Sequence, residues 1–123
     1  MRLGSITLDN TPPMKRTRTY SRVTHHALSI LGKSIRLGRI ERSMTAQDLA
    51  NRAGISRATL HNIESGKPGS EIGIVFEVAA LTGVPLFADD DRTLATHQAR
   101  LDEKLTLLPA RVRPSGHEVD DDF

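Results

Sequence analysis

Apolar residues recur at helical spacing in several stretches of the chain, and polar residues separate these stretches. The periodicity predicts a first helix at about 24–42, two short helices within 45–66, a fourth at 71–82 and a fifth at 91–107. The positions that define the three longer helices are Leu28, Leu31, Ile35 and Ile40; Ile74, Val75, Val78 and Leu81; and Leu94, Gln98, Leu101, Leu105 and Leu108. Gly83 and Pro85 end the fourth helix, so an all-α fold is expected.

The stretch from Thr45 to Gly66 contains the capping and turn residues that are typical of two helices joined by a tight turn. Thr45 is an N-cap residue with Asp48 three places on, close to a capping box. Gly54 permits the positive φ that a short inter-helix turn requires, and Ser56 caps the second helix. The expected buried positions are Leu49, Ala50, Ala53, Ile55, Leu60 and Ile63. Two short helices around such a glycine turn predict a helix-turn-helix, whose second helix can enter a DNA major groove.

The second of these helices turns a polar face outward, formed by Arg57, Ala58, Thr59, His61 and Asn62. Arg57 is suited to guanine O6 and N7, and Asn62 to adenine or a phosphate. Ala58 or the methyl group of Thr59 suits a thymine methyl. A polar face is also what any short surface helix shows, so the prediction depends on the capped partner helix and the basic surroundings.

Charge is divided unevenly along the 123 residues, although the net charge is only +2. Residues 1–67 hold 12 Lys and Arg against 4 Asp and Glu, whereas residues 68–123 hold 5 against 11. A basic half favours a polyanion such as DNA, and an acidic half would be repelled by it; ordinary solvated charge is the alternative. The basic run 15–22 could follow phosphates or enter a minor groove, but a flexible leader is the preferred interpretation.

Composition narrows the class of protein further. Aromatic residues make up 3% of the chain, which indicates an aliphatic core, and the absence of cysteine excludes disulfides and Cys-based zinc sites. No apolar run reaches the roughly 18 residues of a membrane span, and the first 20 residues lack the apolar core of a signal peptide. A cytoplasmic protein without membrane contact is therefore expected.

Three segments that resemble catalytic or metal motifs are better explained otherwise. Residues 31–34, Leu-Gly-Lys-Ser, mimic the end of a P-loop, but the earlier glycine is replaced by Ala27 and no strand precedes them. His25 and His26 are adjacent and cannot share one helix face as metal ligands, and residues 89–91 suit helix capping better than magnesium binding. No nucleophile has a recognisable base, so no enzymatic activity, metal or cofactor is expected.

Residues from about 30 to 87 resemble the lambda-repressor-like, or XRE, family of regulators. The resemblance is carried by "IRLGRIERSMTAQDLANRAGISRATLHNIESGK" and "VFEVAALTGVPLF". It implies a domain of four to five helices in which Arg39 and Glu64 form a partly buried ion pair, and in which Ser65 and Lys67 lie near phosphates. The family commonly has Gln directly after the first N-cap of the motif. Here Ala46 takes that place and Gln47 comes one residue late, so backbone N–H groups would have to hold that phosphate.

The C-terminal third resembles antitoxins of the HipB type, which are partners of HipA-like toxin kinases. The matching segments are "VPLFADDDRTLATHQARLDEKLTLLPARVRP" and "EVDDDF". The likeness implies a homodimer that represses its own operon and binds a kinase-fold toxin. The residues expected to meet the second copy or the toxin are Leu101, Leu105, Leu108, Asp120, Asp121, Asp122 and Phe123. A disordered solubilising tail is the alternative for the last four residues.

Four regions are expected from these patterns. A disordered basic arm covers 1–23, the DNA-binding domain 24–88, a further helix for dimer or partner contact 89–110, and an acidic tail 111–123. The DNA-binding residues expected are Gln47, Ser56, Arg57, Ala58, Thr59, His61, Asn62 and Lys67. The predicted function is a repressor that binds a palindromic operator in double-stranded DNA and serves as an antitoxin; a generic XRE-type regulator without a toxin is the alternative.

Overall fold

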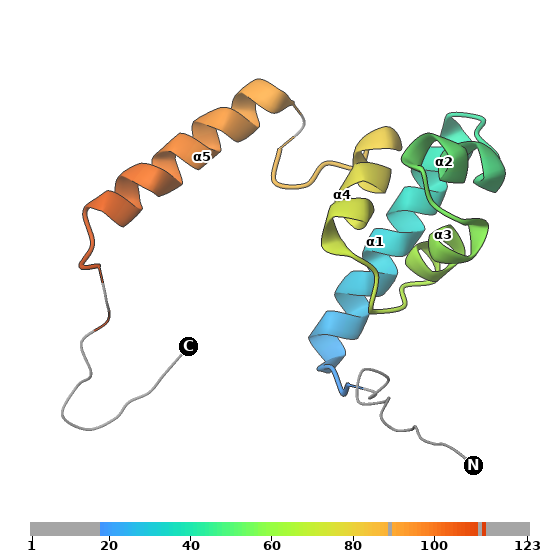
Figure 1. Ribbon diagram of the computed structural model, residues 1–123, viewed down its shortest axis with the longest axis horizontal. Coiled ribbons are helices and arrows are strands. Elements are labelled where there is room, and N and C mark those ends of the chain that lie inside the picture. The colour runs from blue at the N-terminus through green and yellow to red at the C-terminus, as the bar shows by residue number, and fades with distance from the viewer. Residues whose placement is uncertain (1–17, 89, 111, 113–123) are drawn as a thin grey trace, which may run out of the picture.

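Five helices make up the computed structural model, which describes residues 18–88, 90–110 and 112 (Figure 1). They are α1 (Arg22–Glu41), α2 (Ala46–Ala53), α3 (Arg57–Glu64), α4 (Ile72–Leu81) and α5 (Asp91–Thr106). The part of the chain described contains no strand, only an isolated antiparallel bridge between Leu86 and Ala88. The all-α prediction is confirmed.

Helix α1, with 20 residues, is the longest helix described. It begins at Arg22, two residues earlier than the periodicity predicts. Its N-cap is Ser21, whose Oγ accepts a hydrogen bond from the Thr24 backbone N–H at 3.2 Å. Ile40, one of the apolar positions from which this helix is predicted, is 54% exposed. Ile40 follows Ile35 by five residues, which is about 140° around a helix of 3.6 residues per turn, so it lies off the face that Ile35 buries.

The core is assembled from one or two apolar side chains of each of the first four helices, together with Met44 between α1 and α2. α1 packs on α3, and α2 packs on both α3 and α4. The buried apolar residues are Ile35, Met44, Leu49, Ala50, Leu60, Ile63, Val78 and Ala79. Leu49, Ala50, Leu60 and Ile63 are core positions that the sequence predicts, and Ala53 and Ile55 pack against them half-buried. The two motif helices therefore share one core with α1 and α4.

The end of α4 lies against α1 through the only fully buried polar side chain among the described residues, Thr82. Its hydroxyl donates to the carbonyl oxygens of Val78 at 2.8 Å and Ala79 at 3.1 Å. Gly38 of α1 faces the Thr82 backbone so closely that an added Cβ would collide with the Thr82 carbonyl. A glycine is thus required here to let the two helices approach.

Helix α5 stands apart from the four-helix domain (Figure 1), and every one of its residues is exposed. Asp90 caps it by accepting a hydrogen bond from the Thr93 backbone N–H at 2.7 Å, which confirms the capping role expected within residues 89–91. The same bond holds the pKa of the Asp90 carboxyl below its usual range. The helix ends at Thr106, so Leu108 lies beyond it and not on the predicted helical stripe.

Candidate nucleic-acid interface

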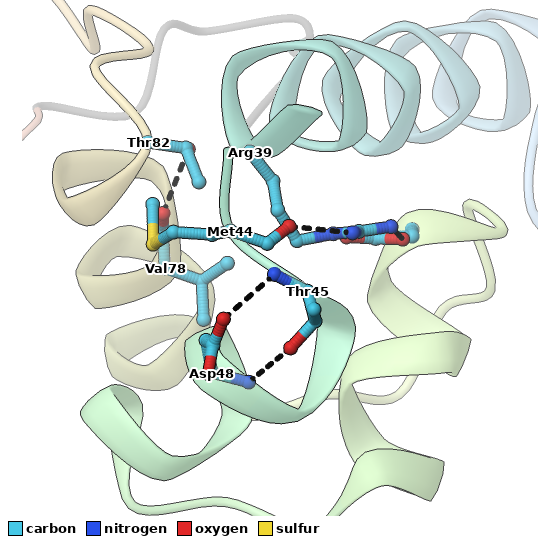
Figure 2. A network of polar contacts seen from close by, with 7 residues as sticks. Arg39, Met44, Thr45, Asp48, Val78 and Thr82 are labelled. Carbon is cyan, nitrogen blue, oxygen red and sulfur yellow. Dashed lines mark hydrogen bonds and ion pairs between the residues drawn. The ribbon is translucent and has the colours of Figure 1, made fainter. Parts of the chain in front are cut away.

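The two motif helices are closed at both ends by the residues that the sequence singles out. The Thr45 hydroxyl accepts from the Asp48 N–H at 3.0 Å, and the Asp48 carboxylate accepts from the Thr45 N–H at 2.9 Å. This complete capping box, seen in Figure 2, holds the pKa of the Asp48 carboxyl below its usual range. Gly54 follows at φ 70°, in the left-handed region, and Ser56 then caps α3 by accepting from the Thr59 N–H at 3.0 Å.

A bidentate ion pair fixes the far end of α3 to α1. The Arg39 Nε donates to Glu64 Oε2 at 2.7 Å and its Nη2 to Glu64 Oε1 at 3.1 Å. Arg39 Nη1 also donates to the carbonyl oxygen of Met44 at 3.0 Å, just ahead of α2 (Figure 2). The hydrogen bonds to Glu64 raise the pKa of Arg39, against the opposing effect of its burial. One guanidinium therefore ties together α1, the entry to α2 and α3, as the family resemblance implies.

The exposed positions of α3 form a solvent-facing surface, with a free arginine at the first residue of the helix. Arg57, Ala58, His61 and Asn62 are all exposed. Thr59 is half-buried, and its hydroxyl accepts from the Ser56 hydroxyl at 3.0 Å. The His61 Nε2 lies 3.4 Å from the Ser65 Oγ, within the same helix. Within the part of the chain that the structure describes, Arg57 and Asn62 have no side-chain hydrogen-bond partner, so their polar groups are available to a ligand.

Beside this face lies a hollow of about 550 Å³ where α1, the start of α2 and α3 meet. Its lining residues are Arg36, Arg39, Ala46, Arg57, Ala58, Leu60, His61, Asn62, Glu64 and Ser65. Three arginines face one acid there, and Arg39 already neutralises that acid, Glu64. Arg36 and Arg57 thus leave an excess of positive charge. The sequence reasoning missed Arg36, although its place three residues before Arg39 puts both on neighbouring positions of one helix face.

The start of α2 offers backbone donors on the rim of this hollow. The capping box uses the N–H groups of Thr45 and Asp48, which leaves those of Ala46 and Gln47 without an acceptor among the described residues. The Gln47 amide donates to the Asn51 Oδ1 at 2.8 Å, on α2 itself. Helix N-termini with free N–H groups attract phosphate, so this end is a candidate contact even though Gln47 has an internal partner.

The other predicted site residues lie in separate places. Lys67 is exposed directly after α3, where Gly66 at φ 76° turns the chain. Leu101 and Leu105 are exposed on α5, away from the motif helices. Residues 120–123 of the predicted tail, and most of the N-terminal arm, lie outside the described residues. Ser56 is exposed, but its hydroxyl serves the cap of α3.

The described residues were also compared with the features of a metal site and of a membrane-spanning helix. They include no cluster of three or more metal-binding side chains. None of their helices combines the length and the apolar character needed to cross a membrane.

Comparison with known proteins identifies the type of domain. Residues 35–87 match the family described as "Helix-turn-helix", and this span runs from the last third of α1 to the segment after α4. Searches among curated proteins and among solved structures found no match. The matched span includes both capped helices, the Gly54 turn and the Arg39–Glu64 pair. The chain thus carries a helix-turn-helix domain like those of XRE-type DNA-binding transcription regulators.

Proposed function

We propose that this protein is a sequence-specific transcriptional repressor that reads base edges with α3. The observation that carries the proposal is the exposed surface of α3, where Arg57 and Ala58 in the first turn and Asn62 in the second have free side chains, while Leu60 and Ile63 fix the helix in the core. Arg57 can donate two hydrogen bonds to guanine O6 and N7, and Asn62 can pair with adenine. Ala58 and the Thr59 methyl suit a thymine methyl group.

Phosphate contacts around α3 would position the helix in the groove. Arg36 and the free N–H groups at the start of α2 border the hollow on one side of α3, and Lys67 follows its other end. Such groups add affinity without reading sequence, because every base pair carries the same phosphates. The basic balance of residues 1–67 acts in the same direction.

The repressor is proposed to act as a homodimer on a palindromic operator. A domain with one recognition helix reads only a few base pairs, whereas two copies related by a two-fold axis read two half-sites about 34 Å apart. The exposed leucines of α5 supply a surface outside the DNA-binding face for this pairing.

The regulator is further proposed to be the antitoxin of a HipA-like kinase, which it would bind through its C-terminal third. The support is the resemblance of residues 84–123 to HipB-type antitoxins, together with the acidic balance of residues 68–123, which suits a basic protein surface and not DNA. The test is co-purification of the full chain with the product of the neighbouring gene. If the neighbouring gene encodes no kinase-like protein, or if its kinase does not bind this chain, the antitoxin proposal fails. The protein would then be a generic XRE-type regulator.

Operator binding is tested by selecting the preferred sequence from random DNA and measuring the affinity of Arg57→Ala. Loss of a bidentate guanine contact should weaken binding to the selected operator by about 1–3 kcal/mol and relax preference at one base pair. Arg100→Ala, which removes another exposed arginine, on α5, is the matched control and should leave affinity unchanged. Equal weakening on random DNA would mean that Arg57 contacts only phosphate, and no selected sequence at all would overturn the proposal.

A further inference from the structure

Helix α5 has an apolar face that stays exposed at Leu101 and Leu105, whereas Leu94 at its start borders a hollow that Phe76 and Phe87 also line. Its leucines Leu94, Leu101 and Leu105 are 37%, 50% and 67% exposed, and no residue of the helix is buried. Most of the stability of a helix in a protein comes from the packing of such a face, and this face extends along the 16 residues of α5. The apolar face of α5 would therefore be stabilised by packing against a second surface.

The spacing along this face is that of a coiled-coil seam. Leu94, Gln98, Leu101 and Leu105 follow one another at intervals of four, three and four residues, so they alternate between the d and a positions of a heptad repeat. Gln98 is the single polar residue of the seam, at an a position. A polar residue there fixes register, because it is best placed against its own counterpart in a second helix.

The charged residues that flank the seam select the orientation. In a parallel pair, position g of one helix lies beside position e of the next heptad in the other helix, which brings His97 beside Asp102 of the second copy, twice by symmetry. An antiparallel pair with matched leucines instead sets Asp102 against Asp102 and Lys104 against Lys104, or Lys104 against His97. Only the parallel arrangement joins a donor to a carboxylate and avoids like charges.

We infer that α5 pairs in parallel with α5 of a second copy of this chain, with Gln98 facing Gln98. The inference rests on the proposed homodimeric repressor and supplies its interface. The two α5 N-termini then lie about 10 Å apart, so both helix-turn-helix domains extend from the same end of the pair. The segment 82–90, which joins α4 to α5, would lead each domain outward toward its half-site.

Single-cysteine cross-linking tests the orientation directly, since the natural chain contains no cysteine. Under mild oxidation the full-length Gln98→Cys variant should form a disulfide-linked dimer, whereas Glu103→Cys, on the outer f position, should not. A dimer by sedimentation that cross-links at neither position would overturn the parallel seam. Equal cross-linking at both positions would mean random collision and would overturn it as well.

Two further comparisons keep the inference falsifiable if cysteine disturbs the helix. Leu101→Asp should raise the dimer dissociation constant by at least about a hundredfold, because both copies lose a buried leucine. Leu107→Asp replaces an off-seam leucine that is 81% exposed and should change it less than about threefold. Equal effects of the two substitutions, or a wild-type chain that stays monomeric at high concentration, would overturn the inference.

Exchange of charges between two chains separates the parallel pair from any other. His97→Glu and Asp102→Lys chains should each dimerise more weakly than the wild type, but their mixture should form a heterodimer. The glutamate introduced in one chain lies beside the lysine introduced in the other only in the parallel register. No recovery in the mixture would overturn the orientation. The outcome is independent of the proposed function, because a chain that cross-links at position 98 but selects no operator would retain the seam and lose the repressor.

Discussion

The close approach of α1 to the end of α3 provides the sharpest test of how the recognition helix is held. Gly32 is buried in α1, and an added Cβ would lie 2.5 Å from the carbonyl oxygen of Ile63 and 2.7 Å from that of Glu64. Both neighbours are backbone atoms at the end of α3, so neither can rotate away. Gly32→Ala must push α3 off α1 or strain both helices.

The expected free-energy change follows from two opposing effects. Overpacking of this kind costs about 1–3 kcal/mol, and replacing a helical glycine by alanine returns at most about 1 kcal/mol. Gly32→Ala should therefore destabilise the domain by about 1–2 kcal/mol, seen in urea unfolding followed by circular dichroism. Gly73→Ala in α4 is the matched control, because nothing lies within 4 Å of its added Cβ, and it should be neutral or stabilising. A Gly32→Ala domain as stable as the Gly73→Ala domain would refute the close packing of α1 and α3.

Three other perturbations have defined outcomes. Glu64→Ala leaves the Arg39 guanidinium, only 13% exposed, without its carboxylate, and should cost about 3 kcal/mol in denaturant unfolding, less if Arg39 is replaced by Met as well. Thr82→Val removes two hydrogen bonds but leaves their carbonyl acceptors bonded to backbone N–H groups, so a loss of about 1 kcal/mol is expected in the same assay. Because the folded pKa of Asp48 lies below its unfolded value, its contribution is complete above the unfolded pKa of about 3.9 and is lost as the pH falls through the folded one. The melting temperatures of wild type and Asp48→Asn should thus differ at pH 7 and converge in acid; a constant gap would contradict the capping box.

Local signals were sufficient for the motif because its geometry depends on neighbours in sequence. Thr45 and Asp48 are three residues apart, and the positive φ of Gly54 and Gly66 is a backbone demand that glycine meets at no steric cost. Such features do not need the rest of the fold. The positions of both motif helices could therefore be predicted within about a residue.

Contacts between distant residues could not be read from spacing. Arg39 and Glu64 are 25 residues apart, and only the family resemblance indicated their pairing. Arg36 lines the hollow because α1 packs on α3, and the periodicity that predicted α1 could not tell which of its sides would be covered. The sequence also could not show which polar side chains are free to contact DNA, since the hydroxyl groups of Ser56 and Thr59 bond to each other once α3 is capped.

The residues that anchor α3 in the fold are different from the exposed residues proposed to read DNA. Leu60 and Ile63 anchor it in the core and Glu64 ties its last turn to α1, so every strong contact leaves from one side. Arg57 and Asn62 are exposed and contribute no described contact to the fold, and substitutions of such exposed side chains usually change stability by less than about 0.5 kcal/mol. A change in operator preference at these two positions can therefore be interpreted as altered readout and not as partial unfolding. The same separation would allow related sequences to change their operators while retaining the domain.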